Sequence, residues 1–376
     1  MKQIATVFAI PLFPTVVISL LSFVTPEDHI PLAIDSKAPD FSLPDVSGKK
    51  YSLSSFSASK VLVILFTCNH CPTAQAYEDR SIQLVNDYQS KGVAVVAIMP
   101  NDDKALRLDE LDFSDLGDSF EDMKVRASEK KFNFPYLYDG ETQAVANAYG
   151  PIATPHVFVF DQERKLRYQG RFDDTESPFK TPTSNDTRNA IESILQGKAV
   201  TVTSTKVFGC SVKWSEKRSQ VEKTLEAWAR EPVKIDSIDE KGIRELLKNT
   251  SDKLRLINVW ATWCGPCTKE FPEFITINRM YRPRDFEFVS ISADNPAKKE
   301  QVLKFLVRNQ ASSKNYLYSG NKYKMIEAID PNWQGALPYT LLVEPGGKIV
   351  YGKQGEIDPY QLKKAIVNNH LLGKYP

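Results

Sequence analysis

Two Cys-x-x-Cys pairs constrain the fold of this chain more than any other feature. They read Cys-Asn-His-Cys at 68–71 and Cys-Gly-Pro-Cys at 264–267, and they use four of the five cysteines. A continuous apolar run, at 60–66 and again at 254–260, precedes each pair and is typical of a buried parallel strand. A stretch with helical character follows each pair. Both pairs are therefore expected where a strand ends and a helix begins.

Such a junction favours a reactive thiol. The first turn of a helix has unpaired N–H groups and a positive dipole end, which stabilise a thiolate. The pKa of a cysteine placed there falls from about 8.5 towards roughly 3.5–7.5. The i, i+3 spacing puts both sulfurs on one helix face, close enough to bond. We expect Cys68 and Cys264 to attack, and Cys71 and Cys267 to resolve the mixed disulfide.

A structural zinc site shared by the two pairs is the main alternative. Zinc ribbons usually separate their pairs by about 15–20 residues, whereas residues 72–263 lie between these two. We therefore predict no metal site, and no cofactor, because the sulfur atoms carry the electrons themselves. The acidic run at 109–122 lacks calcium-loop spacing and is expected to be an exposed insert. Purely structural disulfides remain a second alternative.

The second half of the chain resembles a thioredoxin. The stretch Trp-Ala-Thr-Trp-Cys-Gly-Pro-Cys at 260–267 is similar to the thioredoxin active-site motif. The continuation Thr-Lys-Glu-Phe-Pro at 268–272 resembles extracytoplasmic thioredoxins of the cytochrome-maturation and lipoprotein type. The resemblance covers roughly 233–376. It implies a cis-proline at Pro338, facing the dithiol, and a closing hairpin after it.

The first half resembles the redoxin group, the peroxiredoxin-like (AhpC/TSA-type) relatives of thioredoxin, over about 34–216. The similarity rests on four stretches, at 38–53, 69–80, 132–139 and 209–214. It places Pro155 in the cis-proline position. True peroxiredoxins carry Pro-x-x-x-Thr-x-x-Cys, but here Cys68 stands in the Thr place and Ile64 in the Pro place. Peroxide reduction is therefore in doubt, and the peroxiredoxin alignment would make Cys71 the attacker.

Other residues are candidates for supporting roles. His70 can hold positive charge beside a thiolate, which would make the first pair more oxidising than the second; otherwise it is an exposed residue without a role. Pro155 and Pro338 are expected to shape grooves for extended peptides. Trp263 is expected to pack at the second site and face substrate. Glu270 either moves a proton for the second cysteine or supports the helix dipole.

Cys210 is the one cysteine outside the pairs. It can resolve an oxidised Cys71, pair with another chain, or act as a small buried apolar residue. The role of this third thiol stays open.

The chain has 376 residues, a formal net charge of +1 and 42% hydrophobic residues, values ordinary for globular domains. No basic stripe suggests a nucleic-acid partner. We expect a signal peptide or N-terminal anchor at 1–25, domains at 34–216 and 233–376, and a linker at 217–232. The leader predicts export to an oxidising compartment, periplasmic or otherwise extracytoplasmic, with membrane anchoring if it is retained.

These observations predict two thioredoxin-like three-layer α/β domains with central mixed sheets. The function expected is thiol–disulfide exchange with protein thiols and disulfides, fed by an upstream electron donor. One alternative is a thiol peroxidase whose first domain is reduced by the second. Another is a redox-sensing module whose first domain binds a partner.

Overall fold

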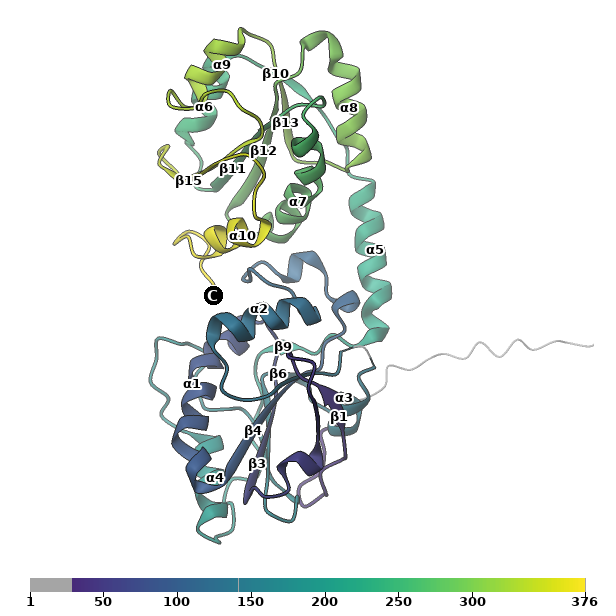
Figure 1. Cartoon of the computed structure of the whole chain (residues 1–376), viewed down its shortest axis with the longest axis vertical. Helices are drawn as coiled ribbons and strands as arrows, with labels where there is room; N and C mark the ends of the chain where they lie inside the picture. Colours follow the sequence, from purple (N-terminus) through teal and green to yellow (C-terminus); the bar gives the residue numbers. More distant parts are fainter. Residues whose placement is uncertain (1–28, 141, 376) are drawn as a thin grey trace, which may run out of the picture.

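The computed structural model describes residues 29–140 and 142–375, so the expected leader at 1–25 lies outside the described residues. Figure 1 shows two α/β lobes stacked along the long axis. Helix α5 (Arg218–Ala229) runs along one side between them. The expected fold class, two thioredoxin-like α/β units with mixed sheets, is confirmed by the strand order and the parallel and antiparallel pairing in each lobe. Among the described residues, no helix combines the length and apolar character needed to cross a bilayer.

The first lobe is built on a five-stranded mixed sheet. Its strands, in spatial order, are β5 (Tyr136–Tyr138), β4 (Val93–Met99), β3 (Val61–Phe66), β7 (His156–Phe160) and β8 (Leu166–Gly170). The first three are parallel, and β7 runs antiparallel to both β3 and β8. Two small ladders flank it, formed by β1 (Ser42–Pro44) with β2 (Lys50–Ser52) and by β6 (Ala153–Thr154) with β9 (Cys210–Ser211).

Strand β3 explains why this lobe has three layers. All six of its side chains are buried, and alternate residues point to opposite faces of the sheet. Leu62, Ile64 and Phe66 belong to a core that includes residues of α3 (Ala144–Tyr149). The other three belong to a core with residues of α1 (Pro72–Tyr88) and α4 (Asp186–Leu195). Helix α2 (Phe120–Lys130) lies at the end of this lobe that faces the second one.

The second lobe has a six-stranded mixed sheet. Its strands, in spatial order, are β10 (Asp236–Ile238), β13 (Lys314–Tyr318), β12 (Phe286–Ser292), β11 (Leu254–Trp260), β14 (Tyr339–Val343) and β15 (Ile349–Gln354). Its helices are α6 (Glu240–Lys248), α7 (Gly265–Tyr281), α8 (Lys299–Arg308), α9 (Lys322–Ile329) and α10 (Pro359–Val367). Short 3₁₀ turns lie at Leu53–Phe56, Gln89–Lys91, Asp103–Ala105, Leu108–Glu110, Ser215–Lys217 and Pro296–Lys298.

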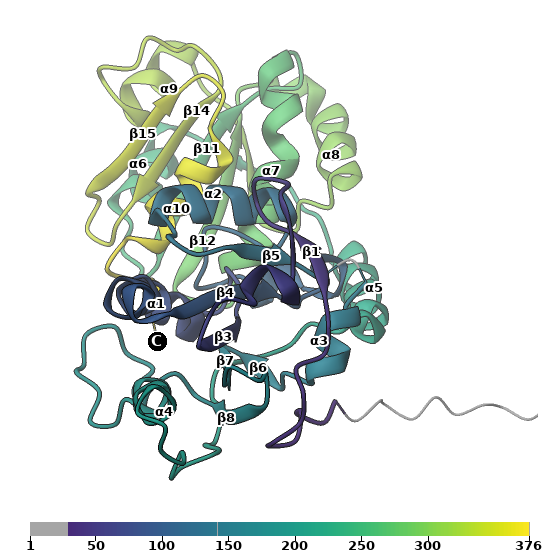
Figure 2. The same ribbon diagram turned by 60° about the horizontal axis from the view of Figure 1, so that its bottom comes forward.

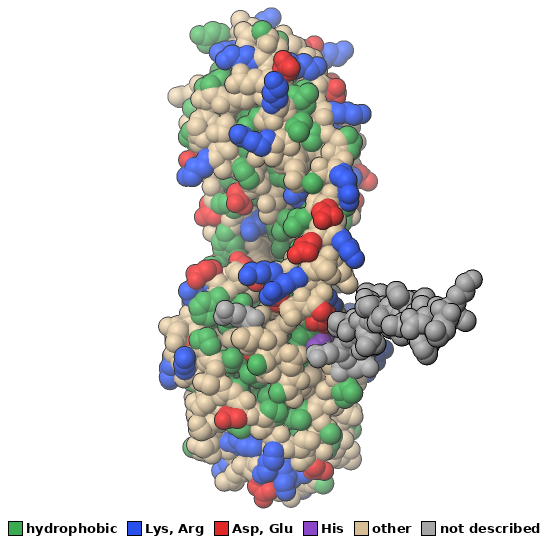
Figure 3. Space-filling view, turned by 90° about the vertical axis from the view of Figure 1, so that its right-hand side faces the viewer, with side chains coloured by type: hydrophobic (Ala, Val, Ile, Leu, Met, Phe, Trp, Pro, Cys, Tyr) green, Lys and Arg blue, Asp and Glu red, His purple; other side chains and the backbone are tan. Residues whose placement is uncertain are grey.

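A segment of the first lobe, residues 101–118, packs into the second lobe and is called here the bridging segment. Its Leu106 and Leu111 are part of the hydrophobic core of the second lobe. Helix α10 faces α2 across the same junction (Figure 1 and Figure 2), where Lys364 Nζ lies 2.8 Å from a carboxylate oxygen of Glu129. Figure 3 shows the waist between the lobes, with positive and negative side chains interspersed on that face.

The expectation that the acidic run at 109–122 is an exposed insert is wrong. Within it, Asp115 and Asp118 are almost completely buried. Asp115 forms ion pairs with Arg126 at 2.9 Å and with Lys374 at 3.1 Å. Basic side chains elsewhere in the chain neutralise these carboxylates. The high density of acidic residues therefore did not predict whether the run is exposed.

Candidate active sites

The second cysteine pair lies at the N-terminal end of α7. Cys264 is the N-cap residue, and the backbone N–H of Cys267 donates to its sulfur at 3.3 Å. The two cysteines form a disulfide with their Cα atoms 5.3 Å apart. Pro266 lies in the first helical turn, where a missing N–H leaves no intrahelical bond unmade. The pair therefore occupies the strand-to-helix junction predicted from the sequence.

The surroundings of this pair combine a rigid base with an exposed rim. The buried Trp260 packs on Phe271 and Phe305, with ring centroids 4.6 and 4.8 Å away. In contrast, Trp263, directly before Cys264, is 61% exposed. A tryptophan this exposed contributes little to a core and offers a large apolar face to another molecule.

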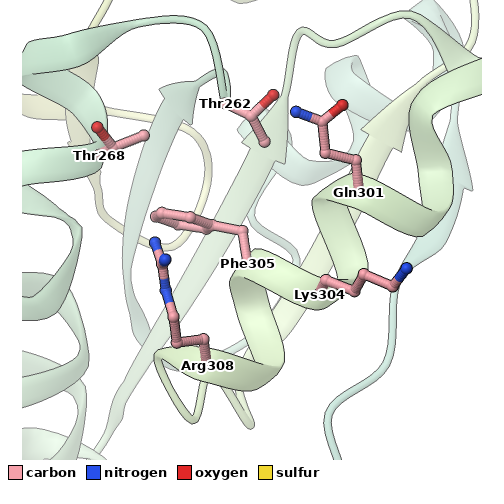
Figure 4. Close-up of a pocket in the computed structure, with 6 residues that line it drawn as sticks. All are labelled: Thr262, Thr268, Gln301, Lys304, Phe305 and Arg308. Carbon is pink, nitrogen blue, oxygen red and sulfur yellow. The ribbon is translucent and has the colours of Figure 1, made fainter.

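A groove of about 450 Å³ lies beside the pair. It is lined by Thr262, Thr268, Gln301, Lys304, Phe305 and Arg308. Figure 4 shows Phe305 and Arg308 pointing from α8 towards α7. Lys304 and Arg308 make the groove electropositive. Neither residue is among those predicted from the sequence.

Glu270 is a buried residue of α7 and does not lie in the first turn of that helix. The helix begins at Gly265, so Glu270 lies in the second turn, which removes the simple dipole explanation. One carboxylate oxygen accepts from the N–H of Ile357 at 2.8 Å, and the other is buried without a hydrogen bond among the described residues. Burial raises the pKa of Glu270 to about 7. This carboxyl group can therefore take up and release a proton near neutral pH.

The first pair has a different register relative to its helix. Helix α1 begins at Pro72, so Cys71 is the N-cap residue and Cys68 lies in the loop after β3. By position on its helix, Cys71 corresponds to Cys264 of the second pair. Both Cys68 and Cys71 are free thiols and are almost completely buried.

The residue before the cis-proline holds both sulfurs of the first pair. Cys68 Sγ lies 3.0 Å from the Thr154 hydroxyl, and Cys71 Sγ lies 3.2 Å from the Thr154 carbonyl oxygen. The Thr154–Pro155 bond is cis, as is the Leu337–Pro338 bond of the second lobe. The predicted cis bonds are thus present, while the role of these prolines in a peptide groove stays a prediction.

The two thiols of the first pair have opposite pKa shifts. Burial raises the pKa of Cys68, reinforced by its hydrogen bond with Cys71 and by the charge of Asp118. Burial also opposes ionisation of Cys71, but the thiols of Cys210 and Cys68 and the charge of His70 outweigh it and lower its pKa. These shifts and the N-cap position favour Cys71 as the attacking thiol, the reverse of the order expected from the spacing alone.

His70 is buried, so an exposed histidine without a role is excluded. Its Nδ1 lies 2.6 Å from a carboxylate oxygen of Asp118. Burial lowers the pKa of His70, but the charge of Asp118 and this hydrogen bond outweigh it, so the pKa is raised overall. A protonated imidazole between the two cysteines would supply the positive charge that a thiolate needs.

Asp118 is the main site residue that the sequence analysis missed. Besides the His70 ring, it accepts the backbone N–H groups of Asn69 at 2.9 Å and His70 at 3.2 Å, and the side-chain amide of Asn101 at 2.7 Å. The bridging segment therefore fixes the loop between the two cysteines. The acidic run contained this residue, but no local spacing connects it to a cysteine 47 or more positions earlier.

Cys210 lies next to the first pair. Strand β9 pairs it with Thr154 of β6, and its backbone N–H donates to Cys71 Sγ at 3.2 Å. The interaction with the Cys71 thiol, together with burial, raises the pKa of Cys210. Cys71 therefore has two neighbouring thiols, Cys68 and Cys210.

The two pairs do not meet. The 17 residues of α7 (Gly265–Tyr281) span about 25 Å, at 1.5 Å per residue. Cys264 lies at one end of this helix, and Tyr281, at the other end, contacts the bridging segment that holds the first pair. The second pair is thus directed away from the first lobe.

Comparisons with known proteins agree with this architecture. Residues 34–169 match the AhpC/TSA family and residues 232–371 match the redoxin family. The two matched segments, one in each lobe, place the chain in the thioredoxin superfamily. The expected pairing of an AhpC/TSA-type redoxin domain with a second thioredoxin-like domain is confirmed.

Individual relatives match only part of this superfamily member. Thiol-disulfide oxidoreductase ResA of Bacillus cereus is 27% identical over 125 residues, which are 33% of this chain and 68% of the relative. Thiol:disulfide interchange protein CycY of Rhizobium leguminosarum is 30% identical over 122 residues, 31% of this chain and 57% of the relative. A hypothetical protein of Sinorhizobium meliloti, of known structure, is 35% identical and covers 49% of this chain and 96% of its own, with a TM-score of 0.44.

Proposed function

We propose that the chain is a thiol–disulfide oxidoreductase that exchanges disulfides with protein substrates through Cys264 and Cys267. The observation that carries this proposal is the Cys264–Cys267 disulfide at the start of α7, beside the exposed Trp263. The similarity to proteins named thiol-disulfide oxidoreductase and thiol:disulfide interchange protein supports it.

The exchange proceeds in two steps that conserve electrons. In the reduced pair, the Cys264 thiolate attacks one sulfur of a substrate disulfide, forms a mixed disulfide and expels the other substrate sulfur as a thiolate. Cys267 then gives up its proton and attacks Cys264, which releases the second substrate sulfur and leaves the Cys264–Cys267 disulfide. The substrate gains two electrons and the Cys264–Cys267 pair loses two. A second dithiol, the electron donor, then reduces the Cys264–Cys267 disulfide by the same exchange chemistry.

Glu270 is the group we assign to proton removal from Cys267. It lies one turn further along α7, is buried, and has a pKa of about 7. At neutral pH a large fraction of this carboxyl is ionised and can accept the proton as Cys267 attacks. When the flow is reversed, the protonated carboxyl returns the proton.

Cys68 and Cys71 form a second dithiol couple in this proposal, with Cys71 attacking and Cys68 resolving. Because both thiols are buried, a protein substrate can reach them only if the bridging segment moves away. Peroxide reduction at Cys71 is a second candidate, favoured by its N-cap position and by the AhpC/TSA match over 34–169. Export to an oxidising compartment, with or without an anchor, remains part of the proposal.

Pair-specific variants of the full chain test the proposal. The measurement is the rate at which the chain reduces a protein disulfide such as that of insulin, with a dithiol as donor. The Cys264→Ser variant should lose nearly all activity, and Cys267→Ser should accumulate a mixed disulfide on Cys264. If Cys264→Ser retains full activity while Cys71→Ser abolishes it, the second pair is not the site of exchange. Peroxide consumption that depends on Cys71 would establish the second candidate.

A further inference from the structure

The first pair is part of a buried cluster of donor atoms of three kinds. Cys68 Sγ, a ring nitrogen of His70 and a carboxylate oxygen of Asp118 all lie within 4.8 Å of one another, and all three residues are buried. Sulfur, nitrogen and oxygen donors this close together are a common arrangement around a bound cation.

The imidazole of His70 has one nitrogen available. Asp118 binds the Nδ1 side at 2.6 Å, whereas Nε2 is buried and makes no hydrogen bond within the described part of the chain. Buried polar atoms nearly always have a partner, so this nitrogen calls for one. A carboxylate on one ring nitrogen is the usual means of orienting the other towards a metal.

Asp118 is better suited to orient His70 than to bind a cation itself. Its two oxygens already accept hydrogen bonds from the backbone of Asn69 and His70, from the Asn101 side chain and from the His70 ring. The Cys71 sulfur contacts the same residue as that of Cys68, because Cys71 Sγ is 3.2 Å from the Thr154 carbonyl oxygen and Cys68 Sγ is 3.0 Å from the Thr154 hydroxyl. The observed pair of donors is Cys68 Sγ and a His70 nitrogen, which lie within 4.8 Å of each other, and the Cys71 sulfur is the donor we add to them.

We propose that the reduced first pair is a binding site for a thiophilic cation, Cu(I) or Zn²⁺, held by Cys68, Cys71 and His70 and supported by Asp118. Thiolate and imidazole ligands select these cations, whereas Mg²⁺ and Ca²⁺ require oxygen ligands. Binding releases to solvent the protons of the two thiols and, from a protonated His70, the proton on Nε2, and it changes no oxidation state. The sequence analysis had predicted no metal, because it considered only a site shared by both pairs.

This inference uses the thiols of the first couple, and it does not depend on activity at the second pair. Cation binding and a Cys68–Cys71 disulfide exclude each other, since both need the same sulfur electrons. A chain loaded with the cation should therefore resist oxidation of the first pair while the second pair still cycles. Metal affinity and disulfide exchange are thus separate measurements, and failure of one leaves the other standing.

The test uses the reduced full chain with Cys264→Ser and Cys267→Ser, which leaves the first pair intact. Zn²⁺ is titrated against a chromogenic chelator, and Cu(I) against a Cu(I)-specific chelator without oxygen. We expect one equivalent of cation per chain. Cys68→Ser and His70→Gln should each lower the affinity at least about tenfold, and Asp118→Asn by about 10–100-fold. The exposed His370, changed to Gln, is the matched control and should bind like the parent.

Alkylation of the unsubstituted chain provides a readout that does not depend on the folding of a variant. The cation should protect Cys68 and Cys71 from a thiol reagent, as measured by peptide mass. Absence of stoichiometric binding, unchanged affinity in both Cys68→Ser and His70→Gln, or unprotected Cys68 and Cys71 would each overturn the proposal. Binding of only one of the two cations supports it and identifies the cation.

Discussion

The hydroxyl of Tyr281 donates a hydrogen bond to the carbonyl oxygen of Ser114 at 2.7 Å, and both residues are completely buried. Tyr281 ends α7 of the second lobe, and Ser114 lies in the bridging segment of the first. The Ser114 hydroxyl in turn accepts from Gln75 of α1 at 3.4 Å. The helix that carries the second pair at its start therefore secures, at its end, the segment that covers the first pair.

Replacing Tyr281 by Phe should loosen this junction. The substitution removes the hydrogen bond from the Tyr281 hydroxyl to the buried Ser114 carbonyl, a loss of about 1–3 kcal/mol. We expect a lower denaturant midpoint for the first unfolding transition and faster hydrogen exchange in the bridging segment. Tyr323→Phe is the control, because Tyr323 is 78% exposed. Equal exchange in both variants would mean that the hydrogen bond does not hold the segment.

The separation of the two pairs predicts that they do not exchange disulfides within one chain in this arrangement. A chain with Cys68→Ser and Cys267→Ser offers Cys71 and Cys264 as the only remaining members of the pairs. Because about 25 Å of α7 lies between them, mild oxidation should give no internal Cys71–Cys264 disulfide. Peptide mapping without reduction measures this. A high yield of that disulfide in monomeric chains would show that the lobes separate and turn.

The order of attack in the first pair can be tested by trapping. Cys71 is the N-cap residue of α1, with the Cys210 N–H directed at its sulfur, whereas Cys68 is outside the helix. A chain with Cys68→Ala and Cys210→Ala, which keeps the backbone N–H of residue 210, should therefore form a stable mixed disulfide at Cys71 with a small aromatic disulfide. A Cys71→Ala chain should react at Cys68 at least about tenfold more slowly, since that thiol lacks these donors. Faster reaction at Cys68 would restore the order expected from the sequence.

The pKa of Glu270, raised by burial to about 7, predicts a pH dependence for the second pair. The base form is the carboxylate, so the rate of the Cys267 step should rise with pH through about 7 and level off above it. Glu270→Gln should remove this rise and slow the step at pH 8 by roughly 10²-fold or more. Stopped-flow measurement of mixed-disulfide resolution gives the profile. Glu273→Gln, on the same helix, is the control.

The raised pKa of Glu270 also affects the free energy of unfolding. Its dependence on pH is opposite in sign to that of a carboxylate whose pKa is lowered by folding. A carboxyl whose folded pKa is above its unfolded value binds more protons when folded. Its contribution is complete below the unfolded pKa of about 4.3 and is lost as pH rises through about 7. The unfolding free energy of the parent minus that of Glu270→Gln should therefore fall over that window, as denaturant curves at several pH values would measure.

Local motifs explain what the sequence could predict. The pairs at 68–71 and 264–267, the strands before them and the cis bonds at Pro155 and Pro338 depend on neighbouring residues, so short patterns contain them. The register of the first helix does not follow from its motif. The spacing suggests that the helix begins directly after Cys68, but α1 begins three residues later. Cys71 rather than Cys68 is therefore the N-cap residue.

Long-range partners explain what the sequence could not predict. Asp118 meets His70 across 48 positions, and Thr154 meets Cys68 across 86. Asp115 is buried because Arg126 and Lys374 compensate its charge, the latter from 259 positions away. The sequence shows Asp115 and Asp118 as members of one acidic run, but in the fold each of them forms its own ion pairs and hydrogen bonds.

The exposed Trp263 offers a test of substrate contact that a structural role would not satisfy. Its side chain is 61% exposed, so Trp263→Ala should change the unfolding free energy by no more than about 0.5 kcal/mol. If the ring contacts a protein substrate, the loss of its apolar face should raise KM several-fold and leave the reaction with a small disulfide unchanged. Steady-state kinetics with insulin and with a small aromatic disulfide separate the two effects. Trp263→Phe should recover part of the loss, and an equal fall with both substrates would indicate that the residue supports Cys264 instead.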